Sequence, residues 1–200
     1  MAILNAKRNN MLLSIILLLL GYKDEVKVNN IQYEIESFYN INIDIKRADM
    51  PNMAYYKLNN RYRADKILNW LSKTYPGDTM IALTSYDIST TYGKTYDWGI
   101  FGLGSLVNNT SVTSVYRFKN KNIEDRLYKI ILHEIGHSYG LPHCSSDDGC
   151  FMKAGDHTIK YIDNEEKKLC NKCKNKLNEL RIKTNYNTRS RNRCIERTAH

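Results

Sequence analysis

Residues 133–144 read HEIGHSYGLPHC, and this stretch places three histidines at spacings that suit one metal ion. His133 and His137 are four residues apart, so on a helix they share one face and lie about 6 Å apart along the axis. Two imidazoles in that arrangement can occupy neighbouring positions of one zinc ion. Glu134 lies beside them without needing to bind the metal, and it can accept a proton from zinc-bound water.

The residues after His137 make this motif specific. Gly140 can adopt a positive φ and end the helix, and Pro142 prevents the helix from continuing. The chain then turns back, which brings His143 to the same metal. Histidines of an ordinary core do not explain the three spacings together. The pattern HExxHxxGxxH predicts a three-histidine zinc site with one open position, where Glu134 assists amide hydrolysis as a general base.

Met152 lies nine residues beyond His143. A methionine beneath the histidine ligands is the second mark of metzincins, which are zinc peptidases with this extended motif. A single methionine is more often core filling. Its place in this series predicts a structural Met-turn.

The five cysteines fall into two close pairs with one left over. Cys144 and Cys150 form the first pair, Cys170 and Cys173 the second, and Cys194 is the fifth. An odd count in close pairs fits metal binding better than a disulfide framework. Four thiolates would make a closed, structural zinc site. Free buried thiols are the alternative, and a redox CxxC lacks the strand that should precede it.

The combined motif closely resembles the archaemetzincins. Their signature joins HExxHxxGxxHC to a second cysteine, x-Met, seventeen residues and CxxC, and here residues 153–169 are those seventeen. One departure is the gap of five residues between Cys144 and Cys150, where four are usual; a loop ending in Gly149 should accommodate the extra residue. Residues 61–65 and Asp87 also look like this family. The resemblance spans most of residues 12–177.

The resemblance implies a single compact zincin-like α/β domain and metallopeptidase activity. It also implies two Zn²⁺ per chain, one catalytic and one structural. The fold should have a twisted mixed five-stranded sheet, an active-site helix and a zinc-bound C-terminal helix. An edge strand over residues 99–107 should line the cleft, where Gly99, Gly102 and Gly104 let a substrate backbone approach. A bulge or a loose edge strand would explain these glycines equally well.

Hydrophobic periodicity predicts the remaining elements. Helices are expected at residues 26–39, around 64–71, at 122–139 with Asn122 as the cap, and from a capping box of Asp163 and Glu166 to about 181. Strands are expected at residues 11–20, 41–45, 80–83, 99–107 and 112–118. Residues 85–98 are polar and are predicted to form a loop.

Residues 11–20 are apolar throughout and allow two interpretations. They are too few for a membrane span, but Lys7 and Arg8 precede them as in a signal peptide. No small-residue cleavage site follows, and Tyr22 stands where a lipoprotein anchor needs a cysteine. We favour an interior parallel strand buried on both faces. The predicted domains are therefore an N-terminal extension at 1–10, a peptidase domain at 11–180 and a basic tail at 181–200.

The net charge of +9 is concentrated in the tail, which alone carries +5. We interpret the tail as a disordered, solvated end, although basic tails can attract nucleic acid or anionic membranes. A zinc-stabilised module that binds nucleic acid is the alternative function, but it leaves Glu134 without a role. The expected partner is a peptide or protein substrate, not nucleic acid. Thiolate ligands favour the cytoplasm, and an exported or membrane-associated protein is expected only if residues 11–20 are a signal segment.

Overall fold

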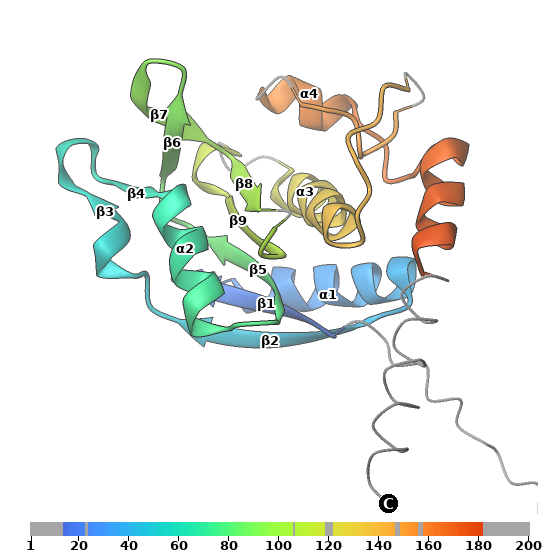
Figure 1. Cartoon of the computed structure of the whole chain (residues 1–200), viewed down its shortest axis with the longest axis horizontal. Coiled ribbons are helices and arrows are strands. Elements are labelled where there is room, and N and C mark those ends of the chain that lie inside the picture. Colours follow the sequence, from blue (N-terminus) through green and yellow to red (C-terminus); the bar gives the residue numbers. More distant parts are fainter. Residues whose placement is uncertain are drawn as a thin grey trace, which may run out of the picture.

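The computed structural model describes residues 14–22, 24–105, 107–118, 122–146, 149–155 and 158–181 (Figure 1). These residues form a mixed α/β domain that contains two β-sheets. Within them, no helix is both long and apolar enough to cross a membrane. The predicted N-terminal extension, most of the basic tail and Cys194 lie outside the described residues.

A five-stranded mixed sheet forms the centre of the fold, as predicted. Its order is β2-β1-β5-β9-β8. The first four strands run parallel to their neighbours, and β8 pairs antiparallel with β9 at one edge. The strands are β1 (Ser14–Leu20), β2 (Asn42–Ala48), β5 (Thr79–Thr84), β8 (Gly102–Ser105) and β9 (Thr110–Ser114).

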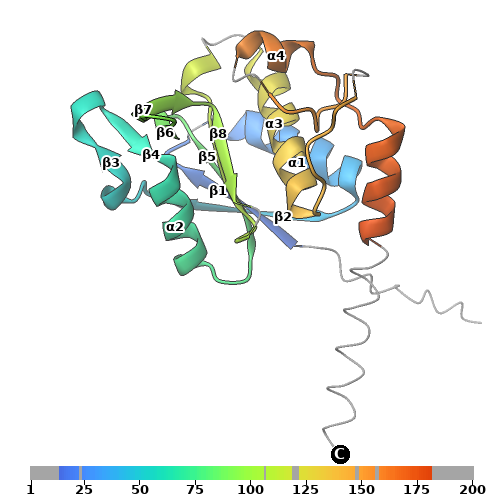
Figure 2. The same ribbon diagram turned by 45° about the horizontal axis from the view of Figure 1, so that its top comes forward.

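Strand β1 is an interior strand, which confirms the preferred interpretation for the part of residues 11–20 that is described. It pairs with β2 on one side and β5 on the other. Ile15, Leu17 and Leu19 face the core shared with α1 (Glu25–Tyr39) and α3 (Ile123–Ser138). Ile16, Leu18 and Leu20 face the core under α2 (Ala64–Thr74). Side chains alternate between the two faces of a strand, so continuous apolar sequence is what two covered faces require. Figure 2 shows α2 on one side of the sheet and α1 and α3 on the other.

A second, four-stranded sheet replaces the loop predicted at residues 85–98. Its order is β3-β4-β6-β7, and β6 and β7 form an antiparallel hairpin that turns at Gly93, whose φ is +56°. The alternation that marks a buried strand is weak there because most side chains of the hairpin are exposed. The strands are β3 (Tyr55–Tyr56), β4 (Arg61–Arg63), β6 (Ile88–Tyr92) and β7 (Thr95–Ile100).

The small sheet is joined to the central sheet through Asp87, one of the residues that resemble the archaemetzincin family. Its carboxylate accepts two hydrogen bonds from Arg117, at 2.7 and 2.9 Å. Arg61 Nε lies 2.8 Å from the same carboxylate, at ion-pair distance but without hydrogen-bond alignment. Arg117 belongs to the 3₁₀ turn η3 (Tyr116–Phe118) that follows β9, whereas Arg61 lies in β4. Two further 3₁₀ turns, η1 (Asn52–Ala54) and η2 (Lys57–Asn59), flank β3.

The C-terminal part contains two helical segments where one was predicted. Helix α4 (Ile159–Asn164) ends before the cysteine pair, and a second segment is helical over residues 171–181. The predicted capping box is therefore wrong: Asp163 lies inside α4 and accepts two hydrogen bonds of 2.7 Å from Arg126 of α3. Asn122 does precede α3, but its side chain makes no capping hydrogen bond and its φ is +50°. Asp163 therefore forms an ion pair with α3 and does not cap the last helical segment.

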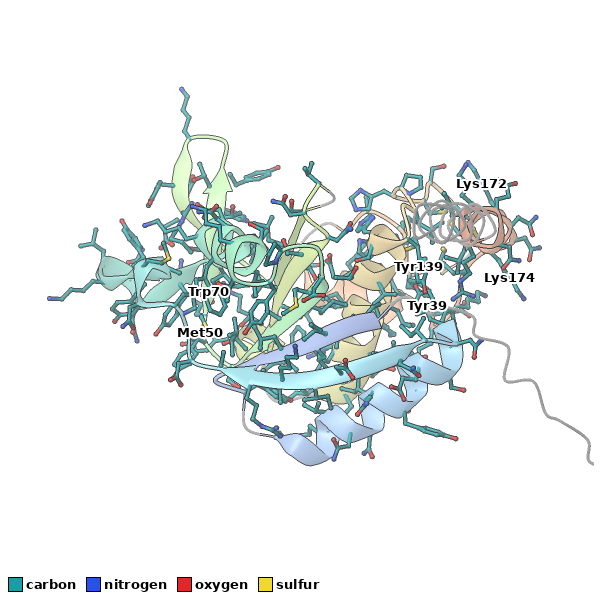
Figure 3. All side chains as sticks on the ribbon, turned by 60° about the horizontal axis from the view of Figure 1, so that its bottom comes forward. Tyr39, Met50, Trp70, Tyr139, Lys172 and Lys174 are labelled. Carbon is teal, nitrogen blue, oxygen red and sulfur yellow. The ribbon has the colours of Figure 1, made fainter. Side chains whose placement is uncertain are left out.

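The segment at 171–181 packs against the end of α1. Arg181 donates a hydrogen bond to the Tyr39 carbonyl, and its guanidinium lies over the rings of Tyr39 and Tyr139, 5.7 and 5.1 Å from their centroids. Figure 3 shows Tyr39 and Tyr139 beside each other here, and Lys172 and Lys174 on the outer side of the segment. The contacts of Arg181 therefore hold the C-terminal end of this segment, whereas Cys170 and Cys173 lie at its N-terminal end.

Candidate active site and metal centres

The end of α3 sets the direction of the HExxH residues and of the chain beyond them. Gly140 has a φ of +87°, as predicted for the helix stop. Its N–H donates to the His137 carbonyl at 2.8 Å, and the N–H of Leu141 donates to the Gly136 carbonyl at 3.0 Å. This pair of bonds is a Schellman motif, which ends the helix and reverses the chain. His143 is therefore carried back toward α3.

The three histidines lie together, as the spacing predicts. One ligand atom from each of His133, His137 and His143 can be chosen so that all lie within 4.8 Å of one another. Ligand atoms bound to one tetrahedral zinc at about 2.0–2.1 Å lie about 3.4 Å apart. A modest rearrangement of side chains would therefore place all three imidazoles around one ion.

Hydrogen bonds to the backbone orient two of the rings. Nδ1 of His133 lies 2.6 Å from the Phe151 carbonyl, and Nδ1 of His137 lies 2.8 Å from the Leu141 carbonyl. A carbonyl only accepts, so each Nδ1 carries the proton and each Nε2 lone pair is left for a metal. Burial lowers the pKa of His133 to about 4 and also lowers the pKa of His137. Both rings are therefore neutral at pH 7, as metal ligation requires.

Glu134 projects into the same cavity. A Cβ added at Gly104 of β8 would come within 2.6 Å of Glu134 Oε2, so the carboxylate lies directly against the edge strand. Burial raises the pKa of Glu134 to about 7. A carboxyl group with that pKa can both take up and release a proton near neutral pH.

The histidines and Glu134 open into a cavity of about 760 Å³. Strand β8, the end of α3, the chain after Met152 and α4 all contribute to its wall. Strand β8 is the last strand of its sheet, so within the described residues one of its edges has no strand partner. The edge of a sheet can pair with an extended peptide. The lining includes Phe101, Gly102, Leu103, Gly104, Ser105, Ile130, Lys153, Ala154, Gly155, Thr158, Ile162 and Glu165.

Of the three glycines predicted at the edge strand, the structure places two on the cavity. Gly102 and Gly104 lie in β8, whereas Gly99 lies in β7 of the small sheet. An added Cβ at Gly99 would overlap the guanidinium of Arg117, so this glycine makes room for the Asp87 ion pair. The single strand predicted from Gly99 to Val107 is wrong because Phe101 separates two strands of different sheets.

Met152 lies beneath the histidines in a turn and is fully buried. Its sulfur occupies the space that a Cβ at Gly136 would fill, between the positions of His133 and His137 on α3. The position agrees with the predicted Met-turn. Tyr39 supports the helix at the same level, since its hydroxyl donates a 2.7 Å hydrogen bond to the Leu132 carbonyl.

The four paired cysteines form a second cluster. Cys144, Cys150, Cys170 and Cys173 are buried and free of disulfides, and their sulfurs all lie within 4.8 Å of one another. Sulfurs on one tetrahedral zinc, at about 2.3 Å each, lie about 3.8 Å apart. The Cys144 and Cys170 sulfurs are 3.6 Å apart. The cluster therefore fits a closed Cys₄ zinc site.

Backbone N–H groups point at these sulfurs. Ser146 N–H donates to Cys144 Sγ at 3.3 Å, and Cys173 N–H donates to Cys170 Sγ at 3.5 Å. Burial raises the pKa of Cys170, but hydrogen bonds from Cys173 and the other thiols outweigh it and lower that pKa to about 7. Burial raises the pKa values of Cys150 and Cys173. A divalent cation would favour the thiolate form of all four.

Three consecutive residues connect the two clusters. Cys150 supplies a thiol to the second cluster, the Phe151 carbonyl orients His133, and Met152 packs under α3. The Met152 carbonyl also accepts a 2.7 Å hydrogen bond from the Cys144 N–H, and the Phe151 N–H donates to the carbonyl of Lys168, just before the CxxC. The cysteine cluster and the histidine cluster therefore share one loop.

Sequence reasoning missed the side chains that shape the far wall of the cavity. Lys153, Thr158 and Glu165 line it, but they belong to no motif. Their position shortly after Met152 was the only available signal. The short helix α4, which Thr158 and Glu165 flank, is not apparent from periodicity, because only Ile162 of its residues is buried.

This fold and cleft define a metallopeptidase of the zinc-dependent HExxH class. The model of peptidase family M54 matches residues 3–179, and the chain belongs to that family. The match confirms the resemblance to archaemetzincins and the metallopeptidase activity it implied.

Similar proteins agree with this assignment. The archaemetzincin of Halobacterium salinarum is 29% identical over 152 residues, which is 70% of this chain and 84% of that protein. The archaemetzincin of Saccharolobus solfataricus is 26% identical over 182 residues, or 84% and 94%. The crystal structure of archaemetzincin from Methanopyrus kandleri matches with a TM-score of 0.73 at 23% identity, covering 86% of this chain and 97% of that one. That from Archaeoglobus fulgidus, complexed with malonate, has a TM-score of 0.69 at 24% identity, covering 82% and 99%. The structural matches support the zincin-like fold.

Proposed function

We propose that the chain hydrolyses peptide bonds with Glu134 as general base and with zinc held by His133, His137 and His143. The observation that carries this proposal is the cavity in which these four residues meet beneath the open edge of β8. Family membership supports a zinc metallopeptidase, and the donor set fits the metal.

Each residue has a defined task in this reaction. Strand β8 pairs with the extended substrate backbone, and Gly102 and Gly104 leave room for it. The three histidines would hold the metal, and His133 and His137 would do so through Nε2, because their Nδ1 atoms donate to backbone carbonyls. Bound zinc supplies a Lewis acid that polarises a carbonyl and lowers the pKa of water to about 7. Glu134 accepts the proton of the attacking water and passes it to the leaving amine.

We further propose a second, structural zinc held by Cys144, Cys150, Cys170 and Cys173, which makes two zinc ions per chain. Burial of all four thiols and the N–H groups aimed at the sulfurs of Cys144 and Cys170 support this assignment. The peptidase domain is proposed to span residues 11–180, with 1–10 as an extension and 181–200 as a basic tail. We retain the cytoplasm as the proposed location, since thiolate ligands persist in a reducing compartment.

Glu134→Gln tests the proposed mechanism. The variant keeps the size and the position of the side chain but cannot take up a proton as a carboxylate does. We expect two zinc ions per chain, near-native stability and a loss of kcat of about 10²–10⁴-fold, because general-base catalysis has that magnitude. Metal analysis and cleavage of a mixed peptide library give the two readouts.

Wild-type protein loaded with zinc is the reference for this experiment. Equal cleavage by wild type and Glu134→Gln would remove Glu134 from the mechanism. No cleavage by either protein would contradict the proposed hydrolysis. A Glu134→Gln protein with only one zinc ion would show that this carboxylate holds metal rather than a proton.

A further inference from the structure

Glu165 lies in the wall of the catalytic cavity but has no role in the hydrolysis described above. It directly follows α4 as its C-cap residue, and its side chain is partly buried. The same cavity contains His133, Glu134 and His137. A substrate held along β8 would pass between this strand and the wall formed by α4.

The carboxylate of Glu165 has no hydrogen-bond or ion-pair partner among the described residues. Lys129 and Lys153 are the cations that act electrostatically on the Glu165 carboxylate, and each also takes part in an interaction of its own. Lys129 lies 2.8 Å from Asp125 and donates to the Ile162 carbonyl at 3.1 Å, and Lys153 has an interaction of its own. Burial accordingly raises the pKa of Glu165 to about 7, although both lysines oppose the shift. A partly buried carboxylate without a partner is costly, and a cation from outside would remove that cost.

We propose that Glu165 selects substrates with a lysine or arginine side chain beside the scissile bond. This inference rests on the proposed peptide hydrolysis. An extended peptide paired with β8 directs alternate side chains to one face, so a residue near the scissile bond is turned toward the cavity wall. Ile130, Ala154 and Ile162 line the same cavity and suit the aliphatic stem of a long basic side chain. Glu165 then meets the charged end.

The charges of the cavity disfavour an acidic side chain at that position. Such a side chain would face the carboxylates of Glu165 and Glu134 in a partly buried space. Lys153 also lines the cavity, and it already takes part in another interaction. The carboxylate without a partner is therefore the group available for selection.

Three matched peptides test this selection. They differ only at one position beside the cleaved bond, which holds lysine, norleucine or glutamate. For wild type we expect kcat/KM for the lysine peptide to exceed that for norleucine by about 10-fold or more, mainly through KM, because an ion-paired hydrogen bond has that strength. The glutamate peptide should be the poorest substrate. Glu165→Gln should bring the ratio of lysine to norleucine close to one.

Glu166→Gln is the matched control, one residue along the chain. Glu166 is 59% exposed, pairs with Lys168 and does not line the cavity. This variant should keep both the rate and the lysine preference. An equal kcat/KM for lysine and norleucine in wild type, or a lysine preference that survives Glu165→Gln, would overturn the inference.

A binding measurement separates this inference from the proposed hydrolysis. In a Glu134→Gln background, the lysine peptide should bind about 10-fold more tightly than norleucine, and adding Glu165→Gln should abolish the difference. If wild type cleaves no peptide, the hydrolysis proposal fails, and this binding ratio still decides whether the cavity selects a basic side chain. Equal binding of both peptides would overturn the selection.

Discussion

The histidine cluster and the cysteine cluster share a loop yet differ in their access to solvent. All four clustered cysteines are at most 8% exposed, whereas His133 and His137 are partly exposed and His143 is exposed. The cysteine set offers four ligands and no space for a substrate. The histidine set offers three ligands at the bottom of a cavity of about 760 Å³. The same metal can therefore stabilise the fold at one site and act on substrates at the other, because ligand number and burial differ.

Removing the cysteine cluster should have the largest effect. In a variant that carries Cys170→Ser and Cys173→Ser, we expect the loss of one zinc ion and a fall of several kcal/mol in the free energy of unfolding. Structural zinc contributes about 10–16 kcal/mol in zinc-finger peptides. The loss should be smaller here because the core between α1, α3 and the sheet remains. Metal analysis and urea unfolding measure both quantities.

Cys194→Ser is the control for this variant, since Cys194 belongs to neither close pair. It should keep two zinc ions and wild-type stability. If the double serine variant also keeps two zinc ions, the cysteine cluster holds no metal.

His137→Ala tests the histidine cluster in the same way. We expect the variant to lose the catalytic zinc and its peptidase activity but to keep the cysteine-bound zinc and most of its stability. The reason is that His137 lies at the cavity, outside the buried core. One zinc ion per chain, together with a urea midpoint close to wild type, would support the division of roles. Complete unfolding would show that the histidine site also stabilises the fold and would contradict this division.

Two glycines give a finer comparison. Gly136→Ala should cost about 1–3 kcal/mol of stability, because the new methyl group meets the buried sulfur of Met152. Gly104→Ala should leave stability nearly unchanged, because the far end of Glu134 can move away in the cavity. It should instead reduce kcat/KM by about 10–100-fold through the displaced carboxylate. Urea unfolding and peptide kinetics on both variants are the measurements. A stability loss in Gly104→Ala with unchanged kinetics, or no stability loss in Gly136→Ala, would contradict this expectation.

Met152→Leu should have the smallest effect. Leucine and methionine have similar volumes, so we expect less than about 1.5 kcal/mol of destabilisation and two zinc ions. Thermal unfolding and metal analysis are sufficient measurements. Loss of the catalytic zinc here would assign the sulfur a function beyond packing.

Sequence reasoning was most successful where one short pattern dictates local geometry. The stop at Gly140, the return of His143 and the grouping of four cysteines all follow from spacing and backbone conformation. The burial of β1 follows from its unbroken apolar sequence. The role of Glu134 and the number of zinc ions stay predictions.

The errors arose where distant contacts replace local signals. Residues 85–98 read as a loop, yet the hairpin of β6 and β7 forms there, with Gly99 making room for the Arg117 that holds Asp87. Asp163 read as part of a helix cap, yet it pairs with Arg126, 37 residues earlier in the chain. Glu165 had no signal beyond its position after Met152, because its place in the cavity depends on how α4 lies across α3. Neither ion pair nor cavity wall leaves a periodic trace in the sequence.

The shared loop also bears on the order in which the chain is synthesised. The HExxH helix and His143 leave the ribosome before Cys170 and Cys173, which follow His143 by 27 and 30 residues. The Phe151 carbonyl that orients His133 belongs to a segment held by Lys168 and by the cysteine cluster. A nascent chain that ends before Lys168 therefore has the three histidines but lacks the residues that fix their geometry. The residues that fix the geometry of the histidines are therefore complete only once Lys168 and the second cysteine pair have been synthesised.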